Sequence, residues 1–218
     1  MVKKDSSGEV SSSPKRPASD RGRYHHGDLR AALLAAAEVV LAERGVEGFT
    51  LRECARRAGV SHAAPAHHFG DVTGLLTAVA TLGFKTLTEF MRQARAGIDD
   101  PEGRLKAIGR GYVAFARLHP ARFHLSFGRH RLNVDDPLLQ AAGHAAFSEL
   151  ETAIRLVNGA GATPLSTDDL DALLHAWSAV HGFAHLLLAG QLDGLVGGGA
   201  DDGIDAALEG VLARMVRR

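Results

Sequence analysis

Apolar residues recur at intervals of three and four positions through most of the chain after residue 28. Leu29, Leu33, Ala36 and Val40, for example, would lie along one side of a helix. Alanine and leucine dominate this part of the chain, β-branched residues are sparse, and no alternating apolar and polar run indicates a strand. The pattern therefore predicts an all-α protein.

Capping residues and helix breakers divide this pattern into about nine helices. Asp28 and Ser61 are predicted N-caps, and Thr50 forms a predicted capping box with Glu53. The glycine-rich segment 194–203 is predicted to be a flexible connection. The expected helices span residues 28–44, 50–59, 61–69, 71–96, 100–119, 120–127, 136–158, 167–191 and 201–218.

Composition divides the chain into three parts. Residues 1–23 contain few apolar side chains and many Ser, Pro, Lys and Arg residues, so they are predicted to form a disordered basic arm. Residues 24–72 hold three complete expected helices, and residues 73–218 hold the longer ones. The sequence thus predicts a small N-terminal three-helix unit followed by a larger helical body.

Charge and cysteine content exclude several classes of protein. The 25 Lys and Arg residues balance the 25 Asp and Glu residues, which excludes a uniformly basic surface but leaves room for a local basic patch. The single cysteine, Cys54, excludes a disulfide framework, and helical periodicity places it toward a core. No apolar run approaches the roughly 18–20 residues of a membrane span, and no secretory signal is recognised, so we expect a soluble cytoplasmic protein.

Residues 50–61 have the outline of a helix-turn-helix: a short capped helix, a turn containing Gly59 and a second helix. The second helix of such a unit enters the major groove of DNA with its first residues against the base edges. An ordinary corner between two helices has the same outline. The residues 50–61 alone leave both interpretations open.

The surrounding sequence resembles the TetR family of transcriptional repressors. Tyr24–Arg30 and the later Trp177, His181 and Gly182 also resemble a subgroup whose C-terminal domain is named after Trp, His and Gly residues. The motifs that carry the family resemblance are Ala-Ala-Ala-Glu-Val-Val-Leu-Ala-Glu-Arg-Gly at 35–45, Gly-Phe-Thr-Leu-Arg at 48–52, Ala-Gly-Val-Ser at 58–61, His-His-Phe at 67–69 and Gly-Leu-Leu at 74–76.

This resemblance implies a one-component regulator that is not an enzyme. It implies a homodimer formed through residues 167–191 and 201–218 that binds a near-palindromic double-stranded DNA operator. The side chains expected between the subunits include Leu186, Leu187, Leu208 and Val211. A small-molecule effector bound in the helical body would release the DNA. The residues that the resemblance assigns to DNA contact are Thr50, Arg52, His62, Ala63, Ala64 and His68. We also expect Ser61 and His67 to contact DNA.

Two positions depart from the family pattern. Ala66 stands where a tyrosine is usual in the third helix, and Val72 stands where a lysine is usual just after it. Both usual residues hold phosphates, which fix the register and supply much of the affinity. Their absence raises the hypothesis of weakened DNA binding.

Aromatic and histidine side chains in the body suggest an effector pocket, although bulky apolar residues in a bundle more often form its core. His181 and His185 also have the spacing of a two-histidine metal pair, but such pairs are more often hydrogen-bonded or line a pocket, so neither a metal nor a cofactor is predicted. The alternative is a helical metal- or ligand-binding protein with weakened DNA binding. The predicted pocket residues are Phe115, Phe123, His144, Trp177, His181 and His185.

Overall fold

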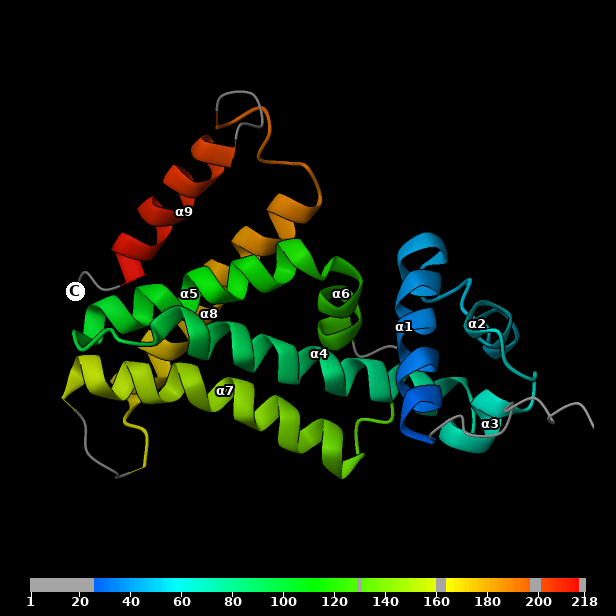
Figure 1. The fold of residues 1–218 in the computed structure, drawn as a ribbon. Helices are drawn as coiled ribbons and strands as arrows, with labels where there is room; N and C mark the ends of the chain where they lie inside the picture. Colours follow the sequence, from blue (N-terminus) through cyan, green and yellow to red (C-terminus); the bar gives the residue numbers. More distant parts are fainter. Residues whose placement is uncertain (1–25, 129–130, 160–163, 197–200, 216–218) are drawn as a thin grey trace, which may run out of the picture.

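The computed structural model describes residues 26–128, 131–159, 164–196 and 201–215. Within these residues the chain forms nine α-helices and no strand, which confirms the all-α prediction. The three N-terminal helices lie at one end of the molecule and the other six form the body (Figure 1). The helices are α1 (His26–Arg44), α2 (Leu51–Ala58), α3 (Ala64–Phe69), α4 (Val72–Arg95), α5 (Pro101–Leu118), α6 (Pro120–Gly128), α7 (Pro137–Asn158), α8 (Thr167–Leu188) and α9 (Asp201–Met215).

Side-chain caps start several helices where the sequence predicts them. The hydroxyl of Thr50 accepts a hydrogen bond from the Glu53 amide at 3.3 Å, and the Asp71 carboxylate accepts one from the Gly74 amide at 2.8 Å. Gly59 ends α2 with a φ of 67°, a left-handed conformation that glycine adopts without steric penalty. Local sequence therefore determines where α2 and α4 begin and where α2 ends.

Three predicted boundaries are wrong. Helix α1 begins at His26, so Asp28 lies inside it, and α8 ends at Leu188, three residues early. The Ser61 side chain does not cap α3, because Ala63 occupies the N-cap position without a side-chain hydrogen bond. In a helix that started at residue 62, the residue at position 65 would donate a backbone hydrogen bond, which Pro65 cannot do because it has no N–H. In a helix that starts at Ala64, Pro65 lies in the first turn, where backbone N–H groups have no partner within the helix, so the missing N–H costs nothing.

The buried apolar residues form two clusters that share α4. One cluster joins the second half of α4 to α5, α6, α7, α8 and α9. The other joins α1, α2 and the first half of α4 to Leu125 of α6 and Leu139 of α7. Cys54 is buried in the second cluster, as predicted, and this burial raises the pKa of its thiol to about 11. Because α4 contributes to both clusters, the domain boundary at residue 72 stays a prediction.

Helix α9 packs onto its own protomer more closely than the sequence suggested. Leu208 is only 6% exposed and belongs to the body's core, which corrects its predicted place between subunits. The Arg110 and Glu209 side chains pair at 2.7 Å, and Arg117 and Asp205 pair at 3.2 Å, so both ion pairs hold α9 against α5. A charge at position 208 would therefore destabilise the protomer itself.

Some expectations concern residues that the structure leaves undescribed. The predicted arm, residues 1–23, lies outside the described residues, as do residues 197–200 of the glycine-rich connection. Residues 194–196 of that connection form turns and residues 201–203 begin α9, while Leu192, just before the connection, is buried against the core. None of the helices in the described part of the chain has both the length and the apolar character needed to span a membrane.

The start of α8 should be sensitive to one hydroxyl. The Ser166 hydroxyl accepts a bond from the Asp169 amide at 3.1 Å, and the Asp169 carboxylate accepts a bond from the Ser166 amide in return. We expect Ser166→Ala to lower the free energy of unfolding by about 0.5–2 kcal/mol, measured by urea denaturation. Ser148→Ala, at an exposed position within α7, is the matched control. An equal loss in both variants would contradict a specific capping role.

Candidate functional site

Helices α2 and α3 form the predicted helix-turn-helix. The turn between them contains Gly59, and the Val60 amide donates to the Ala55 carbonyl at 3.0 Å. Ala55 is fully buried, so its small side chain allows the close contact of α2 with the rest of the unit. The rigid turn and the buried contact fix α3 relative to α2.

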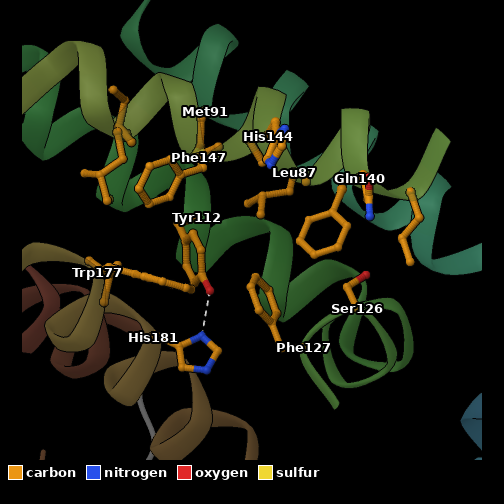
Figure 2. A pocket seen from close by; sticks show the side chains of 18 of the residues that line it. Leu87, Met91, Tyr112, Ser126, Phe127, Gln140, His144, Phe147, Trp177 and His181 are labelled. Carbon is orange, nitrogen blue, oxygen red and sulfur yellow. Dashed lines mark hydrogen bonds between the residues drawn. The ribbon is translucent and has the colours of Figure 1, made fainter. Parts of the chain in front are cut away.

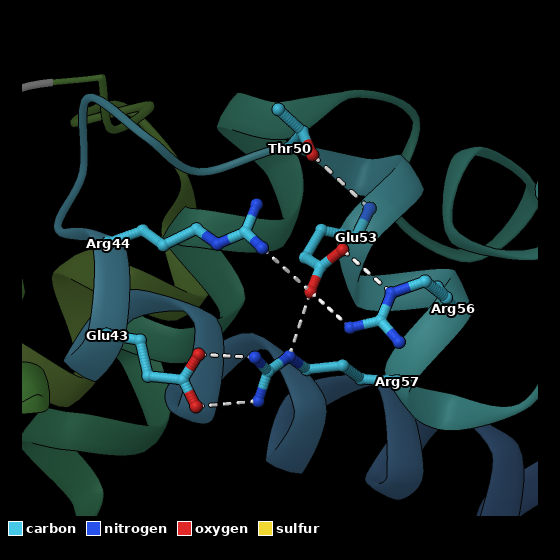
Figure 3. A network of polar contacts seen from close by, with 6 residues as sticks. All are labelled: Glu43, Arg44, Thr50, Glu53, Arg56 and Arg57. Atoms are coloured by element: carbon cyan, nitrogen blue, oxygen red, sulfur yellow. Dashed lines mark hydrogen bonds and ion pairs between the residues drawn. The ribbon is translucent and has the colours of Figure 1, made fainter.

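A network of ion pairs centred on Glu53 ties α2 to the end of α1 (Figure 3). The Glu53 carboxylate accepts from Arg56 at 2.7 Å and from Arg57 at 3.1 Å, and Arg44 lies 3.2 Å away. Arg57 also pairs with Glu43 of α1. Hydrogen bonds from Arg56 and Arg57 lower the pKa of Glu53 to about 2, so the carboxylate stays charged at any physiological pH. Three of the unit's arginines therefore already have carboxylate partners.

Arg52 differs from its neighbours on α2. Its side chain is exposed, and no ion pair or hydrogen bond engages it within the described part of the chain. Thr50 is also exposed; its hydroxyl oxygen caps α2, which leaves the hydroxyl hydrogen available to donate outward. These two residues lie at the start of α2, on the side that the family resemblance assigns to DNA.

The predicted contact residues around α3 are mostly accessible. Ser61, His62 and Ala63 are exposed in the turn before α3, and His67 is exposed on the helix. Ala64 and His68 are half-buried, and the imidazoles of His67 and His68 meet edge to face with ring centroids 5.4 Å apart. Between residues 58 and 84 the chain has no lysine or arginine, so any charge on α3 itself comes from histidine.

The two departures from the family pattern have different surroundings. Ala66 is exposed on α3, whereas Val72 is half-buried at the first position of α4 and packs against the N-terminal cluster. A tyrosine at position 66 would extend into solvent. A lysine at position 72 would have to give up apolar contacts.

A cavity of about 520 Å³ lies within the helical body (Figure 2). Its lining residues come mainly from α4, α5, α7 and α8, and Met215 of α9 also contributes. This volume lies within the usual range of small-molecule sites, roughly 300–1,000 Å³. The polar residues that line the cavity are Tyr112, Ser126, Gln140, His144, Trp177 and His181.

A tyrosine and a histidine form a hydrogen-bonded pair at the cavity wall. The Tyr112 hydroxyl and the His181 Nδ1 atom are 2.7 Å apart (Figure 2). The Phe127 ring packs against the His181 ring with centroids 4.8 Å apart. Burial raises the pKa of Tyr112, whereas burial and the neighbouring imidazole of His185 lower the pKa of His181. Both partners are therefore neutral near pH 7.

Three of the six predicted pocket residues line the cavity. Phe115 and Phe123 are fully buried in the core, and His185, one turn beyond His181, is exposed; none of the three lines the cavity. The sequence analysis missed Phe84 and Gln140, which no motif distinguishes from ordinary helix positions. The predicted residues that do line the cavity are His144, Trp177 and His181.

Among the residues that the structure describes, the histidine pair is not part of a metal cluster. The His181 and His185 rings lie 4.5 Å apart between centroids. Within the described residues, no group of three or more His, Cys, Asp or Glu side chains is placed to hold a metal ion. The arrangement instead places one imidazole, that of His181, at a cavity and the other at the surface.

One end of the cavity reaches the core of the N-terminal unit. Leu139 lines the cavity and is also buried in the apolar cluster that contains α1 and α2. Phe84 and Leu132 line the cavity as well, and both pack against the same cluster. A side-chain displacement at this end of the cavity would therefore disturb the cluster that packs α1 and α2 against α4.

Polar contacts follow the same route from the body to the N-terminal unit. Arg122 of α6 donates to Glu38 of α1 at 2.8 Å and to the Thr86 hydroxyl of α4 at 2.9 Å. The Asn133 amide donates to the Thr77 hydroxyl of α4 at 2.9 Å. Helix α6 and the segment before α7 thus bridge the two clusters.

The burial of His181 should make stability depend on pH. In the folded protein the pKa of His181 lies below the ordinary value of 6.5, because burial favours the neutral imidazole. The contribution of His181 to stability is therefore fully present above about pH 6.5, and it is lost as the pH falls through the folded pKa. We expect the free energy of unfolding to fall between pH 7 and pH 5, and to fall less steeply in His181→Gln. His119 and His124, whose pKa values are also lowered by burial, should keep part of the slope in that variant.

Urea denaturation at a series of pH values measures this slope. His175→Gln, at an exposed position of the same helix, is the control and should keep the wild-type slope. An identical slope in His181→Gln and wild type would contradict the assignment of the neutral form to His181.

Sequence comparison identifies the family. Residues 33–79 match the family described as bacterial regulatory proteins, tetR family, and residues 105–211 match the tetracyclin repressor-like C-terminal domain. The first match covers most of the N-terminal unit, and the second covers most of the body that holds the cavity. The chain belongs to the tetR family of bacterial regulatory proteins. The resemblance to the TetR family is thereby confirmed, and the subgroup named after Trp, His and Gly stays a prediction.

Individual relatives agree with this family. The HTH-type transcriptional regulator BetI of Yersinia pestis (strain Pestoides F) is 34% identical over 94 residues, which are 42% of this chain and 48% of BetI. The match thus spans about half the length of that relative. A solved structure of a protein with unknown function from Rhodococcus sp. RHA1 is 34% identical, with a TM-score of 0.72 over 90% of this chain and 100% of that chain.

A more distant structure shares the fold. The TetR family transcriptional regulator PfmR from Thermus thermophilus is 18% identical, with a TM-score of 0.63 over 85% of this chain and 97% of that chain. At this identity the similarity concerns the arrangement of helices alone.

Proposed function

We propose that this protein is a homodimeric, one-component transcriptional repressor that binds a near-palindromic DNA operator and leaves it when a small molecule fills the cavity. The observation that carries the proposal is the physical connection between the two parts of the candidate site. The cavity wall and the apolar cluster that holds the helix-turn-helix unit share Leu139 and Phe84, so occupancy of the cavity can shift the unit.

The surface of the helix-turn-helix supports DNA contact. Arg52 is exposed without an internal partner among the described residues, so its guanidinium can bind a phosphate or a base edge. His62 and His67 are exposed around α3, the helix that would lie in the major groove. The Glu53 network leaves the other arginines of α2 as positioning residues for the unit.

The exposed faces of α8 and α9 support a dimer. Gly182 has open space where a side chain would begin, and Ser178 beside it is exposed, so a second helix could approach α8 closely. On α9 the small residues Ala206, Gly210 and Ala213 lie on one outward face. Leucines at the borders of the α8 face supply apolar area for a symmetric interface. They are Leu170, Leu174 and Leu186, each more than two-fifths exposed.

Charges on this face should separate the subunits. We expect Leu174→Asp combined with Leu186→Asp to convert the dimer to a monomer, because two carboxylates per subunit would be buried without partners. Light scattering of the purified protein measures the assembly. Val39→Asp, at a similarly exposed apolar position on α1, is the control and should remain dimeric. A double variant that stays dimeric would place the interface elsewhere.

Selection from a random duplex DNA library, followed by footprinting, tests the function. Two helix-turn-helix units related by a twofold axis should select a near-palindrome and protect both half-sites. Arg52→Ala should weaken binding of the selected sequence. A short asymmetric site, or no enrichment above non-specific DNA, would contradict the proposal.

A further inference from the structure

The cavity wall carries no permanent charge. Its 21 lining residues include aliphatic and aromatic side chains and a few neutral polar ones, but no lysine, arginine, aspartate or glutamate among the described residues. A charged group of a ligand would lose its hydration inside the cavity without meeting an opposite charge there, and that desolvation is costly. The wall therefore favours ligands that are uncharged.

Aromatic rings form much of this wall. The rings of Phe84 and Phe127 meet edge to face with centroids 5.4 Å apart, and those of Phe147 and Trp177 do so at 6.2 Å. Aromatic rings in a cavity wall make large contact areas with aliphatic chains and with flat rings of a ligand alike. Most of the ligand surface should accordingly be apolar.

The Tyr112–His181 pair can hydrogen-bond either a donor or an acceptor. If the Tyr112 hydroxyl donates to Nδ1 of His181, its oxygen can accept from a ligand hydroxyl in addition to the Trp177 indole N–H, which also donates to it. If Nδ1 carries the proton and donates to the tyrosine oxygen, the Tyr112 hydrogen is free for a ligand carbonyl. Because the tautomer of the imidazole decides between these states, one site serves two neutral functional groups.

We propose that the cavity binds an uncharged, largely apolar molecule whose single hydroxyl or carbonyl group bonds to the Tyr112–His181 pair. This inference rests on the proposed function only in naming the ligand as the effector. The burial that raises the pKa of Tyr112 and lowers that of His181 agrees with it, because neither side chain supplies a charge near pH 7.

The chain contains a built-in probe of the cavity. Trp177 is its single tryptophan and lines the cavity, so its fluorescence should report occupancy without DNA and without a label. We would titrate the purified protein at pH 7.5 with three molecules that share one ten-carbon chain: decan-1-ol, decanoate and decylammonium. Aliphatic probes do not absorb where tryptophan does, so the emission change comes from the protein.

The expected result is saturable binding of decan-1-ol at least about tenfold tighter than binding of either charged analogue. Equal or tighter binding of decanoate or decylammonium overturns the proposal. The absence of a saturable emission change with decan-1-ol also overturns it.

Two variants test the polar anchor. Tyr112→Phe keeps the ring and removes the hydroxyl, and it should weaken decan-1-ol binding about threefold to tenfold, the effect of one neutral hydrogen bond. Thr88→Val is the matched control, because it removes a buried hydroxyl of α4 that bonds to the Phe84 carbonyl and is absent from the cavity wall. An unchanged affinity in Tyr112→Phe would overturn the assignment of the anchor.

A separate measurement keeps this proposal distinct from the proposed function. The protein bound to its selected DNA is titrated with decan-1-ol while DNA release is followed by fluorescence anisotropy. A saturable change in Trp177 emission without release of the DNA would contradict the repressor mechanism and leave the ligand class supported. Release by decanoate in preference to decan-1-ol would contradict the ligand class and support the repressor mechanism.

Discussion

Operator affinity should rise about tenfold or more when Ala66 is replaced by tyrosine and Val72 by lysine together. Each added phosphate contact resembles a hydrogen bond with a net value of about 0.5–1.5 kcal/mol, and about 1.4 kcal/mol corresponds to one decade in affinity. The tyrosine should contribute the larger part, because Ala66 is exposed and tolerates the larger side chain. Lysine at position 72 loses packing against the N-terminal cluster and stands at the start of a helix, where a positive charge is disfavoured.

A salt titration of operator binding by wild type, both single variants and the pair measures the effect. Val72→Lys should steepen the dependence of log K on log salt by nearly one unit per subunit, whereas Ala66→Tyr should leave that slope unchanged. Sequence preference should stay the same, because phosphate contacts do not read bases. Unfolding by urea controls for lost stability in the lysine variant. A double variant of normal stability that binds no tighter would mean that α3 docks in another orientation.

Ligand binding should fall tenfold to a hundredfold in Gly143→Leu. Gly143 lines the cavity, and the nearest atom that an added Cβ would meet is a Phe84 ring carbon at 3.9 Å, so the position is open. A leucine there occupies volume that the ligand needs, and forcing both into one space costs about 1–3 kcal/mol. DNA affinity in the absence of ligand should be unchanged, because the free protein has room for the side chain.

Decan-1-ol titration of Trp177 fluorescence and anisotropy of labelled operator DNA measure the two properties separately. Gly128→Leu makes the same replacement at an exposed end of α6, where nothing lies within 4 Å, and serves as the control. Wild-type ligand affinity in Gly143→Leu would show that the ligand binds outside this cavity.

The helices of the N-terminal unit could largely be predicted from local sequence. Thr50, Asp71 and Gly59 act within one turn of their own positions, so caps and turns are readable without knowledge of distant residues. The predicted cap at Ser61 was wrong for an equally local reason, because Pro65 moves the start of α3. The family resemblance also depended on short motifs, and comparison of the whole chain confirmed it.

The cavity could only be found in the tertiary structure. Helical periodicity shows that Phe84, Phe115 and Trp177 lie on apolar faces, but it cannot show whether such a face meets another helix or an empty space. Phe115 is fully buried in the core, whereas Phe84 and Trp177 line the cavity. That difference arises from how α4, α5, α7 and α8 are spaced, and the spacing depends on contacts between residues far apart in sequence.

The same limit applies to charge and to assembly. The sequence predicted Arg52 as the arginine that contacts DNA, and the structure supplies a physical reason for this prediction, since Arg44, Arg56 and Arg57 are held by carboxylates of two helices. Leu208 looked like an interface residue until the packing of α9 on α5 and α8 placed it in the core. The sequence by itself thus determined the helices, their caps and the family, because those depend on neighbours along the chain. Tertiary packing decided which side chains remain free to bind DNA, a ligand or a second subunit, because a side chain is free only where no other part of the fold already contacts it.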